Sequence, residues 1–573
     1  MKKLLIPIAA IAIGTSAYLY QSQDKSYNVL NYVPADTPFF SGQLKPFPIK
    51  EYITSSPSLM TPADQEKLDI LYSGDEPALH FFANLGVAYL DGLQDADALV
   101  KTFGLADNIR AYFYTLGLLP VLKIEVANPQ AIWDLLDQNE QKTGFVHKEG
   151  KLQDLLYRAY PLTKPNDPIQ LDLIIAQANG ILTLTLNTQQ VSKDLLAMAL
   201  GLEEASDSLA DSDMLANIIK QHNLSDQSLG FINHLEIVKG LTSTDGNQLA
   251  KQLAEIAKQN NYNPFEMLQT PICEREFTSV AQNWPRTVFG YTKIDISEKE
   301  STLGFASIIE SKNKVILDSL KTLRGYIPNY TQEYKNNVVA TSLGLDISKL
   351  ASSLTSAWTE MQTPMYQCLP LAEAQAQIAD AGQSIAMLGM SANVAAGVKG
   401  VSAAVFDYAI SQVNDQPQLD SFDALIAIHA DKPETIFNSI KMFVPQLQQL
   451  ELTNNGPAIS LNDFEPGLAE LKLDPKLVLK GNHLIIYNGN KGQQEAEKLA
   501  LEKLSSNGLY QVSFDAKKMF TPIVNAAEFA GEIIPEEAMF LVDYDARMNM
   551  KLDINDQGIR FDSTVNNKLP EKQ

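Results

Sequence analysis

The two cysteines, Cys273 and Cys368, have the positions that most clearly suggest chemistry. Each lies shortly after a Gln-Thr-Pro sequence, at residues 269–271 and 362–364, so the two thiols occupy comparable places in the chain. In an oxidising compartment such a pair forms a disulfide where geometry allows. Closing a loop of about 95 residues would stabilise the fold by about 4 to 5 kcal/mol on the chain-entropy model. We therefore predict a structural disulfide, with two buried free thiols as the alternative.

Six histidines are scattered along the chain: His80, His147, His222, His234, His429 and His483. No His-x-His or His-Glu-x-x-His spacing occurs, so the sequence supports no zinc or di-iron site. It also lacks a phosphate-loop motif and a Gly-x-Ser-x-Gly motif, so no catalytic, cofactor-binding or metal-binding residue is predicted. A triad assembled from distant parts of the chain stays open. Its signature would be a serine or carboxylate within hydrogen-bond reach of a histidine in a cleft.

One acidic stretch could supply oxygen ligands to a cation. Its members are Glu203, Glu204, Asp207, Asp211 and Asp213. Carboxylates are calcium ligands, but the ordered spacing of a calcium-binding loop is missing, and the second half of the chain has no matching stretch. We interpret these residues as a solvated insertion, with calcium binding as the alternative.

The amino-terminal end has the pattern of an export segment. Lysines occupy positions 2 and 3, and an uncharged, mostly apolar run follows from Leu4 to Tyr20. The run is long for a signal peptide and at the lower limit for spanning a bilayer. Cleavage after Ala17 would make it a signal peptide, whereas the ring of Tyr18 suits the outer interface of a retained anchor. Both readings stay open.

Composition agrees with a globular, exported chain. The sequence has 573 residues, 45% hydrophobic content and a formal charge of −23 at pH 7. That length allows two or more domains with substantial cores. Any membrane contact is predicted to be through residues 4–20, because no second segment is long and apolar enough to span a bilayer. Such an acidic surface repels phosphate backbones, which argues against a nucleic-acid partner.

Two long stretches of the chain share an order of predicted elements. Residues 122–133 and 426–437 each alternate like a half-buried strand, turn at a proline and begin a helix. Residues 179–186 and 481–487 each follow another alternating strand across a two-residue Asn/Gly turn, which predicts a hairpin. The members of both pairs lie about 300 residues apart, which indicates an internal repeat.

The hairpins lead into predicted helices over Val191–Leu200 and Glu495–Leu504. The two halves also end alike, because residues 293–307 and 551–563 each alternate as two strands around a turn. These last segments are only about 260 residues apart. The second half has therefore lost loop and helix residues relative to the first.

A finer repeat of four segments is also indicated. Each segment has the pattern of a strand, a helix, a Thr-Pro, a second helical stretch and further strands. The Thr-Pro pairs stand at residues 61–62, 270–271, 363–364 and 521–522. Proline disfavours helix at the preceding residue and is tolerated at a helix start, so each pair is predicted to separate two helices. Asp346 and Asp515 stand where helix N-caps are needed.

These patterns predict an α+β protein of two internally duplicated halves, each an antiparallel sheet with helices packed on one face. The predicted domains are a signal peptide or N-terminal membrane anchor at 1–23, a first repeat half at 24–328 and a second at 329–573. The predicted disulfide would join the two halves. Duplicated sheet-and-helix halves form a groove of the kind that takes peptides, lipids or partner strands.

The region after the export segment opens with Tyr-Val-Pro-Ala-Asp-Thr-Pro-Phe-Phe at residues 32–40. This opening resembles that of a group of bacterial envelope proteins in which a Pro-Ala-Asp-Thr sequence precedes the first strand. The resemblance implies an envelope location and modules that alternate strands and helices over several hundred residues. The group has no established activity, so the resemblance implies no functional residue.

The predicted function is therefore non-enzymatic: a binding, scaffolding or assembly factor of the bacterial envelope. We expect it in the periplasm, tethered to the inner membrane by the N-terminal segment, with an envelope protein or lipid as partner and no cofactor. Two alternatives stay open. An envelope hydrolase would have an active site dispersed along the chain, and a periplasmic lipid-binding protein would need a continuous apolar cavity of lipid size.

Overall fold

The structure is a computed structural model that describes residues 28–55, 76–167, 169–297, 299–392, 395–413, 416–531, 534, 542 and 545–568. The predicted signal peptide or anchor at 1–23 lies outside the described residues, as does the Thr-Pro at 61–62. The chain divides into two compact units, described separately below. Unit 1 comprises Met1–Glu310 and Gln367–Pro370, and unit 2 comprises Ser311–Tyr366 and Leu371–Gln573. The units thus divide at residues 310 and 311, whereas the predicted halves divide at 328 and 329.

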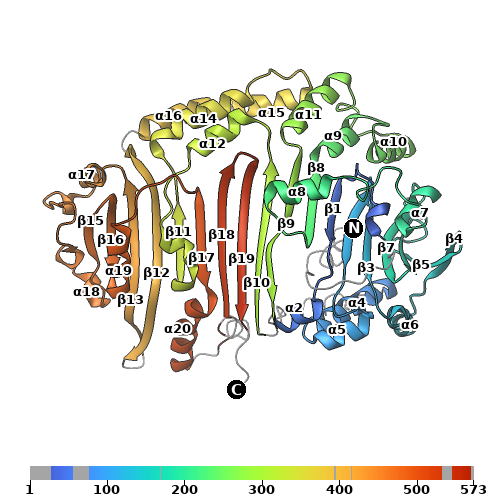
Figure 1. The fold of residues 1–573 in the computed structure, drawn as a ribbon, viewed down its shortest axis with the longest axis horizontal. Coiled ribbons are helices and arrows are strands. Elements are labelled where there is room, and N and C mark those ends of the chain that lie inside the picture. Colours follow the sequence, from blue (N-terminus) through green and yellow to red (C-terminus); the bar gives the residue numbers. More distant parts are fainter. Residues whose placement is uncertain are drawn as a thin grey trace. The chain divides into compact units, whose positions relative to one another are not determined.

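Unit 1 is built on an antiparallel sheet (Figure 1). Its strands are β1 Phe39–Gln43, β2 Ala111–Leu116, β3 Leu119–Glu125, β4 Lys148–Leu152, β5 Leu155–Pro161, β6 Leu171–Ala178, β7 Ile181–Thr188, β8 Ser228–Asn233, β9 Arg286–Ile296 and β10 Glu300–Glu310. The hydrogen-bonded order is β4-β5-β6-β7-β3-β2-β1-β8-β9-β10. Strands β1 and β8, far apart in sequence, are therefore neighbours within the sheet.

The helices of unit 1 connect these strands. They are α2 Ile49–Ser55, α4 Pro77–Gly92, α5 Ala96–Phe103, α6 Pro129–Thr143, α7 Lys193–Leu200, α8 Met214–His222, α9 His234–Thr242, α10 Gln248–Asn260 and α11 Pro271–Asn283. Helix α8 contributes Leu215 and Ile218 to a core that also contains Phe231 of β8 and Val288 of β9. This helix therefore covers one face of the sheet at β8 and β9.

Unit 2 also has an antiparallel sheet (Figure 1). Its strands are β11 Val339–Leu343, β12 Val398–Val413, β13 Gln416–Ala430, β14 Ile459–Ser460, β15 Lys476–Lys480, β16 His483–Asn488, β17 Tyr510–Asp515, β18 Asp545–Asn555 and β19 Gly558–Lys568. The order is β14-β15-β16-β13-β12-β11-β17-β18-β19. Both units are therefore mixtures of helices with antiparallel sheet, and the predicted α+β class is confirmed.

The helices of unit 2 are α12 Lys314–Thr322, α13 Asn329–Gln332, α14 Ile347–Met361, α15 Leu369–Ala379, α16 Ala381–Ala392, α17 Pro433–Phe443, α18 Gly467–Glu470, α19 Gly489–Leu499 and α20 Ala516–Phe529. The first two residues of α15 belong to unit 1. The predicted N-caps of two of them are confirmed. The side chain of Asp346 accepts from the N–H of Ser348 at the start of α14, and Asp515 accepts from Lys518 at the start of α20.

Helices pack on both faces of each sheet, so the prediction of a single covered face is wrong. Successive residues of a strand point to opposite faces. In β6, Ile174 packs with α7, whereas Ile175 packs with α4 and α6. In β15, Val478 packs with α19, whereas Leu477 packs with α17. These strands carry apolar side chains on both faces, as two-sided burial requires. The prediction was wrong because it treated them as alternating strands with one solvated face.

The Thr-Pro pairs have different outcomes. Thr270 caps α11 and Pro271 occupies its first turn, as predicted. Helix α20 instead runs through Pro522 without a break, so the predicted separation of two helices is wrong there. Over the described part of the chain, no helix combines the length and the apolar character that crossing a membrane requires.

Candidate functional site

Unit 2 brings Ser402, His429 and His483 together, although they are distant in sequence. They lie on the adjacent strands β12, β13 and β16, and His429 of β13 is the cross-strand partner of His483 of β16. Ser402 Oγ lies 2.7 Å from His429 Nε2, and the two Nδ1 atoms of the histidines lie 2.8 Å apart. The Tyr330 hydroxyl is 2.5 Å from Ser402 Oγ. This is the geometry of a nucleophile, a base and an orienting group, with a histidine in the carboxylate's place.

Burial separates this network from solvent. Ser402 is 4% exposed, and both histidines are 0% exposed. Burial, together with the neighbouring ring of His483, holds the pKa of His429 well below its usual value. Burial also lowers the pKa of His483 to about 4. Both rings are therefore neutral at pH 7, and one Nδ1 donates its proton to the other. The serine has its hydrogen-bond partners but is not accessible to a substrate.

In unit 1, two further histidines pair with buried glutamates. His222 Nε2 lies 2.8 Å from Glu310 Oε1, and the Arg286 Nε–H donates to Glu310 Oε2 at 2.8 Å. Burial raises the pKa of Glu310, but hydrogen bonds from His222 and Arg286 outweigh it and hold this pKa below its usual value. His147 Nδ1 is 2.6 Å from Glu140 Oε1. Because these carboxylates are engaged inside unit 1, the two pairs serve its core.

The predicted disulfide between Cys273 and Cys368 is present, with an S–S distance of 2.05 Å. Cys273 lies in the first turn of α11. Cys368 lies in residues 367–370, which belong to unit 1 although the chain on either side belongs to unit 2. The backbone N–H of Cys368 also donates to Glu276 Oε2 of α11 at 2.9 Å. The bond therefore fastens this short segment to α11.

The acidic stretch after α7 uses carboxylates in local hydrogen bonds. Glu204 accepts from Asn31 Nδ2 at 2.9 Å, and Asp211 accepts from the Ser208 hydroxyl at 2.6 Å. Among the residues that the structure describes, no group of three or more histidine, cysteine, aspartate or glutamate side chains is arranged to hold a metal ion.

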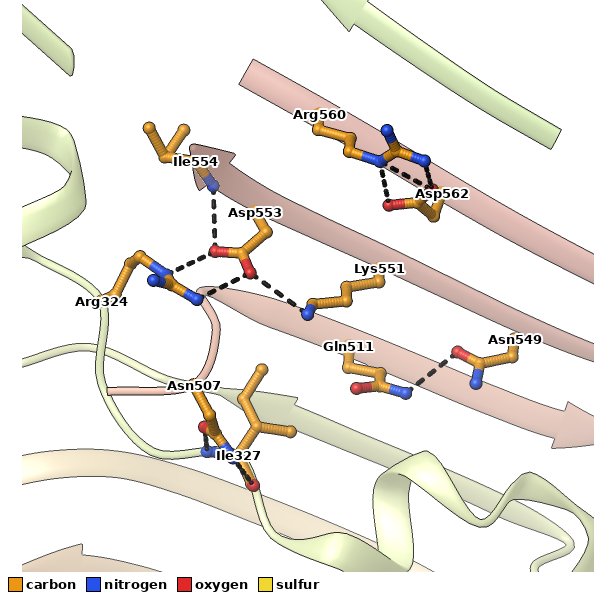
Figure 2. Close-up of polar contacts among 10 residues, drawn as sticks. All are labelled: Arg324, Ile327, Asn507, Gln511, Asn549, Lys551, Asp553, Ile554, Arg560 and Asp562. Atoms are coloured by element: carbon orange, nitrogen blue, oxygen red, sulfur yellow. Dashed lines mark hydrogen bonds and ion pairs between the residues drawn. The ribbon is translucent and has the colours of Figure 1, made fainter. Parts of the chain in front are cut away.

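A charged pocket of about 350 Å³ lies in unit 2, beside α12 and the β18–β19 hairpin. Its lining contains charged side chains with one apolar and one amide residue: Lys321, Arg324, Lys551, Asp553, Ile554, Asn555, Asp556, Arg560 and Asp562. Figure 2 shows how Arg324, from the segment after α12, points toward the charges of the hairpin. This pocket is the candidate functional site.

The strand register explains the arrangement of the hairpin charges. Lys551 and Asp553 are two residues apart on β18, so both side chains point to one face. Their cross-strand partners on β19 are Asp562 and Arg560, respectively. Each strand thus carries one charge of each sign, and each charge faces its opposite, an arrangement that favours this pairing.

Asp553 is the centre of the network (Figure 2). Its Oδ1 lies 2.7 Å from Arg324 Nε and accepts from the Ile554 N–H at 2.9 Å. Its Oδ2 accepts from Arg324 Nη2 at 3.0 Å and lies 3.1 Å from Lys551 Nζ. The Asp553 side chain is only 15% exposed. The forked contact fixes the Arg324 guanidinium in one orientation.

Two other cations complete the lining. Arg560 Nε and Nη2 both donate to Asp562, at 2.9 Å and 2.7 Å to Oδ1. Lys321 pairs with Asp556 in the hairpin turn and with Asp318 one turn earlier on α12. Hydrogen bonds to Asp318 and Asp556 raise the pKa of Lys321, and the pKa of Asp556 is lowered in return. The Lys321 side chain therefore stays charged at neutral pH.

The sequence did not predict this pocket. The pattern of residues 551–554 and 559–563 predicts only two strands around a turn, like those at the end of the first half. A usable signal was present, because Lys551 with Asp553 and Arg560 with Asp562 place two charges on one face of each strand. Arg324 had no such signal, since it reaches the hairpin across more than two hundred residues of sequence.

A second pocket of about 360 Å³ lies between α12 and α14. Hydroxyl side chains dominate its lining, which consists of Val315, Asp318, Ser319, Thr322, Ser352, Ser353 and Ser356. Neither pocket has the continuous apolar wall that a lipid-binding protein would need. Comparisons with protein-family models, with curated proteins and with solved structures find no match.

Proposed function

We propose that this protein is a non-catalytic binding protein of the bacterial envelope, exposed to the periplasm, and that the charged pocket of unit 2 is its ligand site. One contrast carries the proposal. The Ser402–His429–His483 network is sealed in the core, whereas the pocket is lined by partly exposed charges and includes no serine, cysteine or histidine. Reactive geometry without access supports a structural role, and accessible charges without a serine–histidine or cysteine–histidine pair support binding.

We also propose that the two units are duplicated copies, and the order of their strands supports this. The order β6-β7-β3-β2-β1-β8-β9-β10 in unit 1 has its counterpart in β15-β16-β13-β12-β11-β17-β18-β19 of unit 2. Each unit is also symmetric about one pair of neighbouring strands, β1 and β8 in unit 1 and β11 and β17 in unit 2. Each strand of the pair is followed along the chain by one or more helices and then by a hairpin. That symmetry supports the finer repeat of four segments.

The pairing registers support the duplication more strongly than strand order alone. Phe40 pairs with Tyr114 and Phe231, and Ala340 at the same place in unit 2 pairs with Ala404 and Ser513. Continuing outward, Phe231 pairs with Val288 just as Ser513 pairs with Asn549. A register error of one residue would turn every side chain to the other face. In the other direction, the same correspondence matches Val121 with Leu425 and Thr185 with Tyr487. These pairs have the spacings of the sequence matches between 122–133 and 426–437 and between 179–186 and 481–487, an agreement that chance similarity of sheets would not give.

The pocket lies where unit 2 departs from unit 1. Unit 1 has α8 in residues 201–227, between α7 and β8, whereas unit 2 has only residues 500–509 between α19 and β17. Under α8, unit 1 buries Leu229, Val288, Gly290 and Ala306. The matched registers place Gln511, Asn549, Lys551 and Asp562 at these positions in unit 2. Loss of the helix thus accompanies replacement of a core by polar and charged side chains.

The need to solvate a sheet face that no helix covers does not by itself explain how the charges of the pocket are arranged. Polar side chains spread over an open surface would satisfy that need. Here the charges are gathered and recessed: the Arg560 side chain is 18% exposed and that of Asp553 is 15% exposed. Charged groups that are fixed in place before a ligand arrives lower the cost of binding it. The recess therefore supports a ligand site.

The disulfide supports the proposed compartment. Such bonds persist in oxidising surroundings and are rare in the cytosol. Cys273 and Cys368 are the two cysteines of the chain, and they are bonded to each other. Together with the lysines and apolar run at the amino terminus, this favours the periplasm, with residues 4–20 as signal peptide or tether.

A fluorophosphonate probe tests the non-catalytic part of the proposal, because it labels accessible, activated serines. In the folded full-length protein we expect no labelling of Ser402 above the level of a Ser402→Ala variant. A serine hydrolase of known activity in the same reaction verifies the probe. Labelling of Ser402 that disappears in Ser402→Ala would instead favour the envelope hydrolase.

A further inference from the structure

We propose that an exposed apolar face of the unit 2 sheet docks an amphipathic, cationic α-helix of a partner protein. This docking face is distinct from the charged pocket. On β18, Leu552 of the docking face stands between Lys551 and Asp553 of the pocket. Successive side chains of a strand point to opposite faces of the sheet. The two surfaces therefore lie on opposite faces, and the inference goes beyond the proposed function.

A row of large apolar side chains crosses five neighbouring strands of this face. In cross-strand order the row consists of Phe561 on β19, Leu552 on β18, Tyr510 on β17, Leu343 on β11 and Val401 on β12. Each of these side chains is between 37% and 45% exposed. Because each one is the direct cross-strand partner of the next, the row is continuous.

The docking face is also apolar beyond this row. On β13 and β16, Ile426 and Ile486 pair with each other and are 59% and 37% exposed. Two residues from the row, the strand registers bring together the uncharged side chains of Thr341, Ala403, Val512 and Met550. A solvated sheet face carries polar side chains at such positions. A contiguous exposed apolar patch of several hundred Å² instead marks an interaction site.

Helices stand on the docking face near both ends of its strands. At one end, Ile347 of α14 packs against the same small cluster as Ile428, which is two residues beyond Ile426 on β13. At the other end, the Tyr408 hydroxyl of β12 donates to a backbone carbonyl of α20. Tyr408 pairs with Phe422, which points to the same face as Ile426. Figure 1 shows α14 and α20 at opposite ends of these strands.

The stretch between these helices suits a single helix better than a second sheet. Strand β11, in the middle of the sheet, has five residues, Val339–Leu343, which span about 13 Å. A helix with its side chains is about 10 to 12 Å across. A second sheet would lie about 10 Å above the face, in the layer that α14 and α20 already occupy at its ends. Stacking of a second copy through this face is therefore disfavoured.

The spacing of the row also matches a helix that lies along it. Neighbouring strands are about 4.8 Å apart, so a row of five strands is about 19 Å long. A helix of about 13 residues spans that length, and its rise of about 5.4 Å per turn is close to the strand spacing. Apolar side chains at i, i+3, i+4 and i+7 of the partner would therefore meet successive strands.

The sign of the partner's polar side follows from the charge of the chain. The formal net charge is −23, whereas the side chains named above for the docking face are uncharged. The apolar side of the helix thus meets no charge, and its outer side faces an acidic protein. Lysine or arginine on that outer side favours encounter and suppresses repulsion.

A fluorescence anisotropy titration of the full-length protein tests the inference. The probe is a labelled leucine–lysine peptide of about 14 residues with leucines at i, i+3, i+4 and i+7. A peptide of the same composition with the leucines scattered around the helix is the matched probe. We expect saturable binding of the amphipathic peptide, at least tenfold tighter than that of the scattered one.

Three variants locate the binding. Leu343→Asp and Ile426→Asp should each weaken it at least tenfold, because each removes an apolar anchor and places a charge under the helix. Mere attraction of a cationic peptide to the acidic chain would instead grow with an added carboxylate. Leu501→Asp is the control, since Leu501 is 85% exposed and follows α19, which packs on the opposite face. It should not weaken binding, and thermal unfolding verifies that all three variants fold.

Several results would overturn the proposal. Equal binding of the two peptides, or binding that neither docking-face variant weakens, would show that no helix docks there. Phosphatidylcholine vesicles that bind in place of the peptide, with binding reduced by Leu343→Asp, would assign the face to a lipid surface. A dimer in analytical ultracentrifugation that Leu343→Asp dissociates would assign it to a second copy of the chain.

Discussion

At the scale of single residues, the unit cores contain ionisable groups whose pKa values are lowered by burial. His429 and His483 in unit 2 and Lys123 in unit 1 are each 0% exposed. The sequence could not identify them as buried, because a histidine or lysine among apolar residues of a strand is equally compatible with either face. Their placement depends on strand pairing between distant segments, such as β13 with β16. Their titration therefore gives residue-level tests of the fold.

The histidine pair predicts a loss of stability in mild acid. Unfolded histidines bind a proton as pH falls below the usual pKa of 6.5, whereas burial holds the pKa of His483 at about 4 and that of His429 well below 6.5. Stability is therefore fully present above pH 6.5 and falls as pH drops toward 4. His483 alone contributes up to about 3 kcal/mol of this loss. Urea unfolding between pH 7 and pH 4 measures it.

NMR titration of the histidine ring protons gives the site-specific check. We expect the His483 signal to show no protonation between pH 7.5 and pH 5.5. A midpoint near the ordinary histidine value would mean that the ring is solvated, and the sealed network would then be wrong.

Lys123 predicts a gain in stability on substitution. Burial lowers the pKa of this lysine from 10.5 to about 7, and its Nζ lies 3.1 Å from Thr183 Oγ1. As pH falls from 10.5 toward 7, the unfolded chain binds this proton and the folded chain does not, so stability falls. Lys123→Met should therefore raise the free energy of unfolding at pH 7 by about 1 to 4 kcal/mol. Denaturant unfolding at pH 7 and pH 10 measures the difference.

The gain from Lys123→Met should shrink as the pH rises to 10. The control is Lys498→Met, since the side chain of Lys498 is 67% exposed and is expected to leave stability nearly unchanged. A loss of stability in Lys123→Met at pH 7 would contradict the prediction, because it would mean that the ammonium contributes favourably to the core.

At the scale of elements, the sequence predicted the features that depend on neighbouring residues, such as turns. The hairpin at Asn179–Gly180 was predicted from its turn residues, and both have the positive φ that a type I′ turn requires, 54° and 74°. The helix predicted at 495–504 is instead α19, Gly489–Leu499. Glycine disfavours helix, but a Cβ on Gly492 would lie 2.5 Å from the Ala424 carbonyl oxygen. Close packing on β13 therefore overrides propensity, and single-sequence patterns do not contain that contact.

The disulfide predicts a localised effect on α11 and residues 367–370. Its loop of 95 residues corresponds to about 4 to 5 kcal/mol on the chain-entropy model. The Cys273→Ser, Cys368→Ser double variant should lower the thermal midpoint and speed hydrogen exchange in these two segments. The contacts of Glu276 with the N–H of Cys368 are expected to loosen with them. Equal exchange in the variant and the wild type would show that the bond does not hold the segment.

At the scale of the whole molecule, each unit has an antiparallel sheet, and the proposed duplication explains both what they share and where they differ. The sequence indicates the proposed repeat because strand alternation, prolines and turns recur at nearly constant spacing. The pocket could not be predicted in the same way. It depends on the absence of a counterpart to α8 from residues 500–509, and on a long-range contact between Arg324 and Asp553. Absence of an element leaves no motif in the sequence, only a shortened spacing.

The central claim is that the charged pocket of unit 2 is the ligand site of an exported, non-catalytic protein. Site-specific photocrosslinking in intact bacterial cells tests it most directly, with the reactive side chain at Asp556, which is 86% exposed at the rim, and a matched control at Lys498. We predict a reproducible crosslinked envelope molecule from position 556 that is absent from position 498 and lost when Lys551→Gln is added. Identical crosslinks from both positions, or none from position 556, would contradict the claim.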